Sequence, residues 1–227
     1  MAYRSTPANR RLPLLALVLA GAIAFAQWKG CWPKDAGKSA ASGPVVRPPE
    51  RPAGTAMPNS RKIGTWEEWQ GCTLIEDRGN DGDSFRVRQG GTDHILRLYF
   101  ADCPEKYRNQ YNKDRISEQG RYFGGLTEEE TLEVGESARD FSLGCLREAP
   151  FTVLTRSEQV FESGRYYAFV TTRQGDLAEL LVGKGLARIH TKGDSRPGGA
   201  SSAQSKQRLL AIERKARTAK VGGWAKR

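Results

Sequence analysis

The chain has 227 residues and a mass of 25.1 kDa, and its 36 Lys and Arg against 26 Asp and Glu give a formal net charge of +10. Hydrophobic residues make up 38% of the sequence, which is enough for a packed core and excludes a wholly disordered chain. A mean hydropathy of −0.61 and a single long apolar run exclude a multi-pass membrane protein.

The positive charge is concentrated at the two ends of the chain. Residues 1–60 hold eight basic and two acidic residues, a net +6, and residues 198–227 hold eight basic and one acidic residue, a net +7. The 61–197 region is slightly acidic, with 20 basic and 23 acidic residues, a net −3. The excess indicates an anionic partner, either nucleic acid or a membrane surface, although basic tails also serve solubility alone.

Residues 1–31 are typical of a targeting segment. Three arginines precede residues 12–26, an uncharged run of fifteen that ends in the A-x-A pattern of a cleavage site. Because a membrane-spanning helix needs about 20 residues, a cleaved export signal is the first interpretation and an uncleaved membrane anchor the second. Both predict that the rest of the chain is exported, as a periplasmic, secreted or membrane-anchored protein. Membrane contact is then expected through this segment alone.

The next part, residues 32–60, contains six prolines separated by Ala, Gly and Ser, with no apolar period. This composition predicts an extended linker that carries a folded domain at residues 61–227. The four cysteines, at 31, 72, 103 and 145, allow three disulfide pairings in an exported chain, among which the sequence does not choose.

The first half of the domain predicts an antiparallel three-stranded meander. Residues 72–77, 84–88 and 93–100 carry apolar residues at strand spacing, and a glycine turn joins the last two. The polar stretch 106–125 follows and is expected to be a loop, either at the substrate or simply solvated.

Helices and two further strands follow in the second half. Thr127 and Glu130 form a capping box that begins a helix. Strands are expected at 151–156 and 166–172, a short helix after Asp176, and a last helix at 202–220. Five short strands interrupted by one helix suit an OB-fold, a five-stranded barrel, here accompanied by three helices in an α+β domain.

Two acidic clusters bracket the second and third strands. They are the segments 81–84 (DGDS) and 102–105 (DCPE), which the antiparallel pairing brings to the same end of the sheet. Several carboxylates at one place repel one another unless a cation lies among them, and oxygen ligands select a hard ion such as Ca²⁺ or Mg²⁺. Taken alone, each cluster is also ordinary turn chemistry.

An arginine in the middle of an apolar strand adds a second signal. Arg97 interrupts the run 95–99, where a charged side chain is costly unless it is paired. Its partner is either a buried carboxylate or a phosphate, which the planar guanidinium fits. Arg165 could supply a second guanidinium, although taken alone it is more typical of a solvated loop.

Taken together, these segments resemble the staphylococcal-nuclease (thermonuclease) family over about residues 70–227. Each matching segment is short, but their order and content are specific. The resemblance implies an OB-type barrel with three helices and a metal-dependent phosphodiesterase of the endonuclease type. It implies hydrolysis of DNA or RNA to 3′-phosphates with Ca²⁺ as cofactor. The matching segments are 81–85, 96–98, 102–105, 164–165, 167–168, 180–182, 185–187, 215–216 and 223–224.

The resemblance also implies a metal site. Asp83 and Asp102 match the carboxylates that bind calcium. Cys103 stands where the family usually has Thr, but there the ligand is the main-chain carbonyl, so the change need not abolish the site. Asp81 matches an acid that lies near the metal without binding it.

Three residues match the groups that act on the substrate. Glu105 corresponds to the carboxylate that activates or orients the attacking water, and Arg97 and Arg165 correspond to the arginines that hold the scissile phosphate. The physics agrees, since attack adds charge to the phosphate oxygens and guanidinium groups stabilise it there. We expect a monomer that acts on DNA, RNA or both.

Two features depart from the family pattern. The tyrosines that flank the bound nucleotide have no clear match, which leaves base preference open, and the segment 106–125 is longer than usual. The alternative hypothesis is a non-catalytic nucleic-acid-binding OB-fold module tethered to the cell envelope. The sequence favours the enzyme, because it retains together the five residues Asp83, Asp102, Glu105, Arg97 and Arg165.

Overall fold

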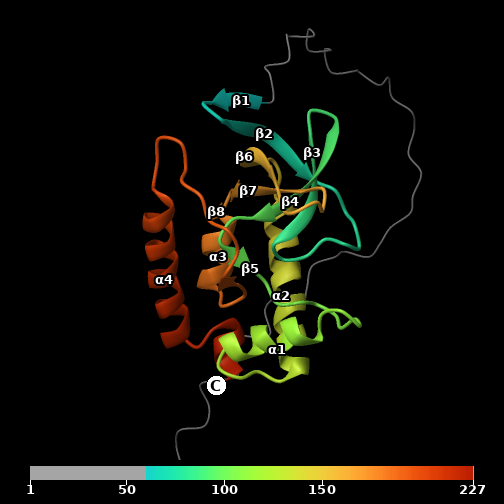
Figure 1. The fold of residues 1–227 in the computed structure, drawn as a ribbon, viewed down its shortest axis with the longest axis vertical. Coiled ribbons are helices and arrows are strands. Elements are labelled where there is room, and N and C mark those ends of the chain that lie inside the picture. Colours follow the sequence, from blue (N-terminus) through green and yellow to red (C-terminus); the bar gives the residue numbers. More distant parts are fainter. Residues whose placement is uncertain (1–59, 227) are drawn as a thin grey trace, which may run out of the picture. The chain divides into compact units, whose positions relative to one another are not determined.

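The computed structural model of the protein describes residues 60–226 (Figure 1). The predicted export segment 1–31 and the linker 32–60 lie outside these residues, except for Ser60, where the first strand begins. No helix in the described part of the chain combines the length and apolar character that crossing a membrane requires.

Five strands close into a barrel. They are β2 (Trp66–Leu74), β3 (Ser84–Gln89), β4 (Thr92–Leu98), β6 (Phe151–Gln159) and β7 (Arg165–Thr172). Pairing runs β2–β3–β4–β7–β6, parallel only between β4 and β7, and antiparallel pairing of β6 with β2 closes the circle. The strand β1 (Ser60–Ile63) pairs with the N-terminal half of β2, residues 66–69. The predicted five-stranded OB-fold barrel is therefore confirmed.

Alternating side chains explain why these segments form barrel strands. In β3, Phe85 and Val87 are buried while Arg86 and Arg88 are exposed. The strand β2 begins earlier than the predicted 72–77. Its register with β6 shifts between Trp69 and Cys72, and this irregularity interrupts the alternation of buried and exposed residues that would have indicated the first half of the strand. The inward-facing residues make one continuous core with the helices.

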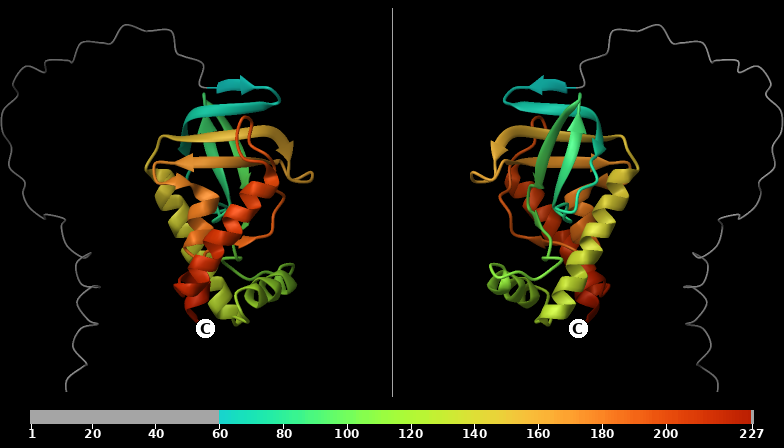
Figure 2. Two further views of the ribbon diagram at one scale, coloured as in Figure 1. Left: turned by 90° about the vertical axis from the view of Figure 1, so that its left-hand side faces the viewer. Right: turned by 90° about the vertical axis from the view of Figure 1, so that its right-hand side faces the viewer.

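Four α-helices of the described chain lie together on one side of the barrel (Figure 2): α1 (Lys113–Tyr122), α2 (Glu128–Arg147), α3 (Leu177–Gly183) and α4 (Ser202–Thr218). The capping box at Thr127 and Glu130 is present at the start of α2, as predicted, and Asp176 caps α3. The short helix η1 (Gly222–Lys226) follows α4.

Helix α1 corrects the prediction that residues 106–125 form a loop. Ile116, Gln119 and Gly120 are buried and Phe123 follows at the next turn, so one face of the segment has helical spacing. Phe123 packs on Trp224, with ring centroids 4.8 Å apart. The domain therefore has one helix more than the three expected.

A second, two-stranded sheet lies beside the barrel. The strand β5 (Ala101–Asp102) pairs antiparallel with β9 (Arg188–Ile189), in the register that sets Asp102 opposite Arg188. A further short strand, β8 (Gly175–Asp176), pairs with β7. The β5–β9 pairing brings residues far apart in the chain to one place, where the site is built.

Candidate active site

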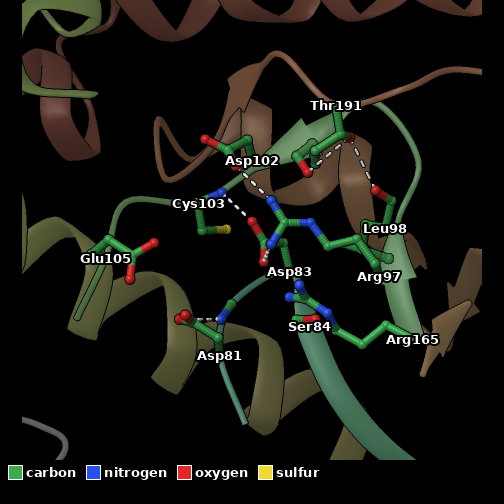
Figure 3. A network of polar contacts seen from close by, with 12 residues as sticks. Asp81, Asp83, Ser84, Arg97, Leu98, Asp102, Cys103, Glu105, Arg165 and Thr191 are labelled. Atoms are coloured by element: carbon green, nitrogen blue, oxygen red, sulfur yellow. Dashed lines mark hydrogen bonds and ion pairs between the residues drawn. The ribbon is translucent and has the colours of Figure 1, made fainter. Parts of the chain in front are cut away.

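Arg97 joins the two acidic clusters. Asp83 precedes β3 and Asp102 lies in β5, and the β3–β4 register pairs Ser84 with Arg97. Nη1 of Arg97 lies 2.8 Å from Oδ1 of Asp83, and its Nη2 lies 2.5 Å from Oδ1 of Asp102 (Figure 3). The predicted convergence of the clusters is thus correct, and Arg97 has both carboxylates as partners.

Asp102 is the most heavily paired carboxylate of the site. Its Oδ1 also accepts from Arg115 Nη2 at 2.8 Å, and its Oδ2 accepts from Arg188 Nε at 2.6 Å and Gln119 Nε2 at 3.2 Å. Burial disfavours its charge, but Arg97, Arg115 and Arg188 outweigh that effect and hold the pKa of Asp102 below its ordinary value. Asp102 is therefore ionised and surrounded by positive charge.

Asp83 has the opposite environment. It is 1% exposed, and its Oδ2 accepts from the Cys103 amide at 2.5 Å. Burial, with smaller contributions from Asp102 and Asp81, raises the pKa of Asp83 to about 7 against the attraction of Arg97. Burial also raises the pKa of Asp81, whose Oδ1 accepts from the Gly82 amide at 2.8 Å. Negative charge is thus under-compensated on this side of the site.

Glu105 is held by three groups that come from α1 and the residue before it. Its Oε1 lies 3.1 Å from Arg115 Nη1, and its Oε2 accepts from Asn112 Nδ2 at 3.3 Å. Its amide donates to Gln119 Oε1 at 3.0 Å. The main chain of Glu105 lies directly against α2 at Gly135, where a Cβ would be 2.2 Å from the Glu105 carbonyl oxygen. The position of Glu105 is therefore defined from both helices.

A cavity of about 1060 Å³ opens beside this cluster. Arg97 and Asp102 form part of its wall, together with the predicted Arg165. Asp83 and Glu105 do not line it, whereas Arg115, which forms an ion pair with Glu105, does. The cavity wall comprises Arg97, Asp102, Asp114, Arg115, Glu118, Arg121, Glu158, Gln159, Val160, Phe161, Arg165, Tyr167, Arg188, His190, Thr191 and Lys192.

Arg165 differs from Arg97, Arg115 and Arg188 in its partners. Its Nε donates to Ser163 Oγ at 3.2 Å, and within residues 60–226 it makes no ion pair with a carboxylate. Its charge is therefore available to a ligand in the cavity, whereas those of Arg97 and Arg188 are already shared with Asp102.

The donor set is suited in part to a calcium ion. Asp83 and Asp102 both contact Arg97, so the guanidinium now lies where these two carboxylates meet. Oxygen donors of this kind are those that Ca²⁺ takes. The Cys103 carbonyl, however, already accepts from Gln119 Nε2 at 3.0 Å. Among the described residues no three acidic, His or Cys side chains form a metal-binding group.

Three site residues were not predicted from the sequence. Arg115 and Gln119 come from α1, and the helical spacing of Ile116, Gly120 and Phe123 could have revealed that helix. Arg188 is 3% exposed and bridges Asp102 and, at 2.9 Å, Glu118 Oε1. Asp102 and Arg188 are 86 positions apart, and no local pattern indicates that they pair.

The three cysteines of the described chain, Cys72, Cys103 and Cys145, are buried and unpaired. Burial raises the pKa of the Cys103 thiol well above its ordinary value, so this side chain is a neutral part of the core. Cys31 lies outside the described residues.

Fold and site together define an OB-fold barrel with buried carboxylates beside an arginine-lined cavity, the architecture of a protein that binds a phosphate-bearing polymer. The sequence model of the staphylococcal nuclease homologue family matches residues 95–226, more than half of the chain, and the chain belongs to this family. The match begins in β4, so Asp81 and Asp83 precede it. No curated protein matches the chain.

Proposed function

We propose that the protein is a nuclease that hydrolyses phosphodiester bonds of DNA, RNA or both. The observation that carries this proposal is the meeting of Arg97 and Arg165 in one cavity, beside buried carboxylates, in a chain of the staphylococcal nuclease homologue family. The fold alone supports only nucleic-acid binding, because OB-fold barrels commonly bind oligonucleotides without cutting them.

Substrate binding follows from the charges of the cavity. A phosphodiester is an anion, and Arg165 carries a charge that no carboxylate of the described chain neutralises. The cavity of about 1060 Å³ is at the upper end of the range of small-molecule sites, roughly 300–1,000 Å³, so a nucleotide unit fits. Guanidinium groups bind phosphate oxygens in pairs, which orients the phosphorus for attack.

The chemical step needs a base and a place for the developing charge. Water attacks the phosphorus and gives one proton to Glu105, and the bond to the leaving oxygen breaks as that oxygen takes a proton from solvent. Arg97 and Arg165 donate to the phosphate oxygens, whose charge grows in the transition state. Because Glu105 does not line the cavity and is oriented by Arg115, it acts through a bridging water.

Calcium dependence is part of the proposal. Asp83, Asp102 and the Cys103 carbonyl would hold the ion, because their oxygens are donors of the kind that Ca²⁺ takes and both carboxylates meet at Arg97. A bound Ca²⁺ supplies positive charge to a phosphate oxygen and lowers the pKa of attacking water. We also propose export, on the strength of residues 1–31 alone.

A non-catalytic nucleic-acid-binding module is the second candidate. The observation that favours it is the engagement of every carboxylate oxygen of Asp83, Asp102 and Glu105 by a donor of the chain itself. A site in this state binds phosphate through its arginines but has no free base.

The test compares cleavage of labelled single-stranded DNA and RNA by the full-length chain in Ca²⁺ and in excess chelator. The nuclease cuts in Ca²⁺ and stops in chelator, and Glu105→Gln loses most of the rate. Glu129→Gln is the matched control, because Glu129 is exposed on α2 and does not line the cavity. Binding without cleavage would identify the second candidate, and cleavage unaffected by chelator would reject calcium dependence.

A further inference from the structure

An exposed aromatic side chain stands at the edge of the arginine-lined cavity. Phe161, in the turn between β6 and β7, is 87% exposed and forms part of the cavity wall with Arg165. The other two large exposed hydrophobic residues of the described chain, Tyr107 and Tyr111, do not line this cavity. Phe161 contributes almost nothing to the core, so its position calls for another explanation.

The turn that carries Phe161 is tied to Arg165. The Val160 amide donates to the Arg165 carbonyl at 2.8 Å, and Ser163 Oγ donates to the Val160 carbonyl at 2.5 Å. Ser163 Oγ in turn accepts from Arg165 Nε at 3.2 Å. One hydroxyl group therefore couples the guanidinium of Arg165 to the backbone of the turn.

The backbone of Phe161 has an uncommon conformation. Its φ of 49° lies in the left-handed region, which a bulky residue rarely adopts and which the surrounding hydrogen bonds must maintain. The ring lies outside the core and in the wall of the cavity, which Arg165 also lines.

We propose that Phe161 is a stacking platform for the base of an unpaired nucleotide whose phosphate is held by Arg165. An aromatic ring beside a cationic groove is the arrangement that binds single-stranded nucleic acid, because every base has a face that can stack. In a duplex both faces of a base are covered by its neighbours, so this platform selects single strands and frayed ends. The inference rests on the proposed nucleic-acid substrate, but not on cleavage.

The experiment uses tryptophan as a reporter of stacking. Phe161→Trp and the matched control Tyr111→Trp, which is 88% exposed but away from the cavity, are each made in the full-length chain. Each is titrated in Ca²⁺ with short thymidine strands joined by cleavage-resistant phosphorothioate linkages, with abasic strands of the same length, and with a duplex.

The thymidine strand is expected to quench Phe161→Trp fluorescence, whereas the abasic strand and the duplex are not, and Tyr111→Trp is expected not to respond. Phe161→Ala is expected to weaken thymidine-strand binding about tenfold and Phe161→Tyr to retain it, with unchanged thermal midpoints because the residue is exposed.

Equal binding by Phe161→Ala and the parent, equal quenching by thymidine and abasic strands, or no strand binding at all would overturn the inference. A protein that shows the Phe161-dependent binding but cuts no unmodified strand keeps the stacking platform and loses only the nuclease.

Discussion

Arg115 Nη1 lies 3.1 Å from Glu105 Oε1, so the predicted base of the reaction is paired with an arginine from helix α1. The same guanidinium contacts Asp102 Oδ1 at 2.8 Å and forms part of the cavity wall. Arg115 therefore connects the two carboxylates to the place where substrate would lie. A helix that is additional to the expected three contributes directly to the geometry of the site.

Removing the charge of Arg115 is expected to lower activity. In Arg115→Gln the Glu105 carboxylate loses its ion pair and its fixed orientation, and we expect kcat to fall about tenfold, which corresponds to about 1.4 kcal/mol. The kcat of Arg115→Lys, which keeps the charge without the bidentate geometry, is expected to lie between that of the parent and that of Arg115→Gln. Steady-state kinetics measure the change, with Arg173→Gln, at an exposed position outside the cavity wall, as control. A variant faster than the parent would mean that Arg115 blocks Glu105 instead of positioning it.

Gln119 is expected to be important for stability. Its side chain is fully buried, donates to Asp102 Oδ2 and the Cys103 carbonyl, and accepts from the Glu105 amide. Gln119→Leu removes the side-chain partner of the Cys103 carbonyl and of the Glu105 amide, while Asp102 Oδ2 keeps Arg188, and we expect a cost of about 2 kcal/mol of the free energy of unfolding. Urea unfolding measures this loss. Gln70→Leu, at an exposed position, is expected to change stability by less than about 0.5 kcal/mol.

Two glycines of α2 provide a matched pair. A Cβ at Gly135 would lie 2.2 Å from the Glu105 carbonyl oxygen and 2.7 Å from that of Pro104, whereas one at Gly144 meets no atom within 4 Å. Gly135→Ala is therefore expected to displace the Glu105 loop and abolish most activity. Gly144→Ala is expected to stabilise the helix by about 0.5–1 kcal/mol and to leave activity unchanged. Equal activity of the two variants would show that the loop tolerates the shift.

The pKa of Asp83 predicts how stability depends on pH. Because burial raises this pKa from 3.8 to about 7, the folded state binds a proton that the unfolded state has lost between these values. In chelator, the contribution of Asp83 to the free energy of unfolding is therefore expected to be fully present below about pH 4 and to be lost as the pH rises towards 7. Asp83→Asn is expected to flatten this dependence, measured by urea unfolding across the range. An unchanged slope in the variant would place the titration elsewhere.

Much of the barrel and part of the helical layer could be predicted from local sequence patterns. Alternation in β3, the capping box at Thr127 and the cap at Asp176 are local features, and each formed as expected because neighbouring residues alone satisfy them. The spacing of the acidic clusters around one hairpin likewise predicted that Asp83 and Asp102 would meet. The residues assigned to phosphate, Arg97 and Arg165, both line the cavity.

The pairing of charged side chains within the site follows from the packing of distant segments and could not be predicted from the sequence. Arg97 could pair with a carboxylate or with a phosphate, and the fold gives it two carboxylates. The pairing of Asp102 with Arg188 depends on two short strands that meet across 86 positions, and no sequence period encodes such a contact. Helix α1 was not predicted from the sequence because most of its residues are polar and exposed. Its structural role, which is to hold the 102–105 segment through Gln119 and Arg115, depends on contacts between separate parts of the chain. Local preferences specify elements, but a site assembled from distant segments is specified by their packing.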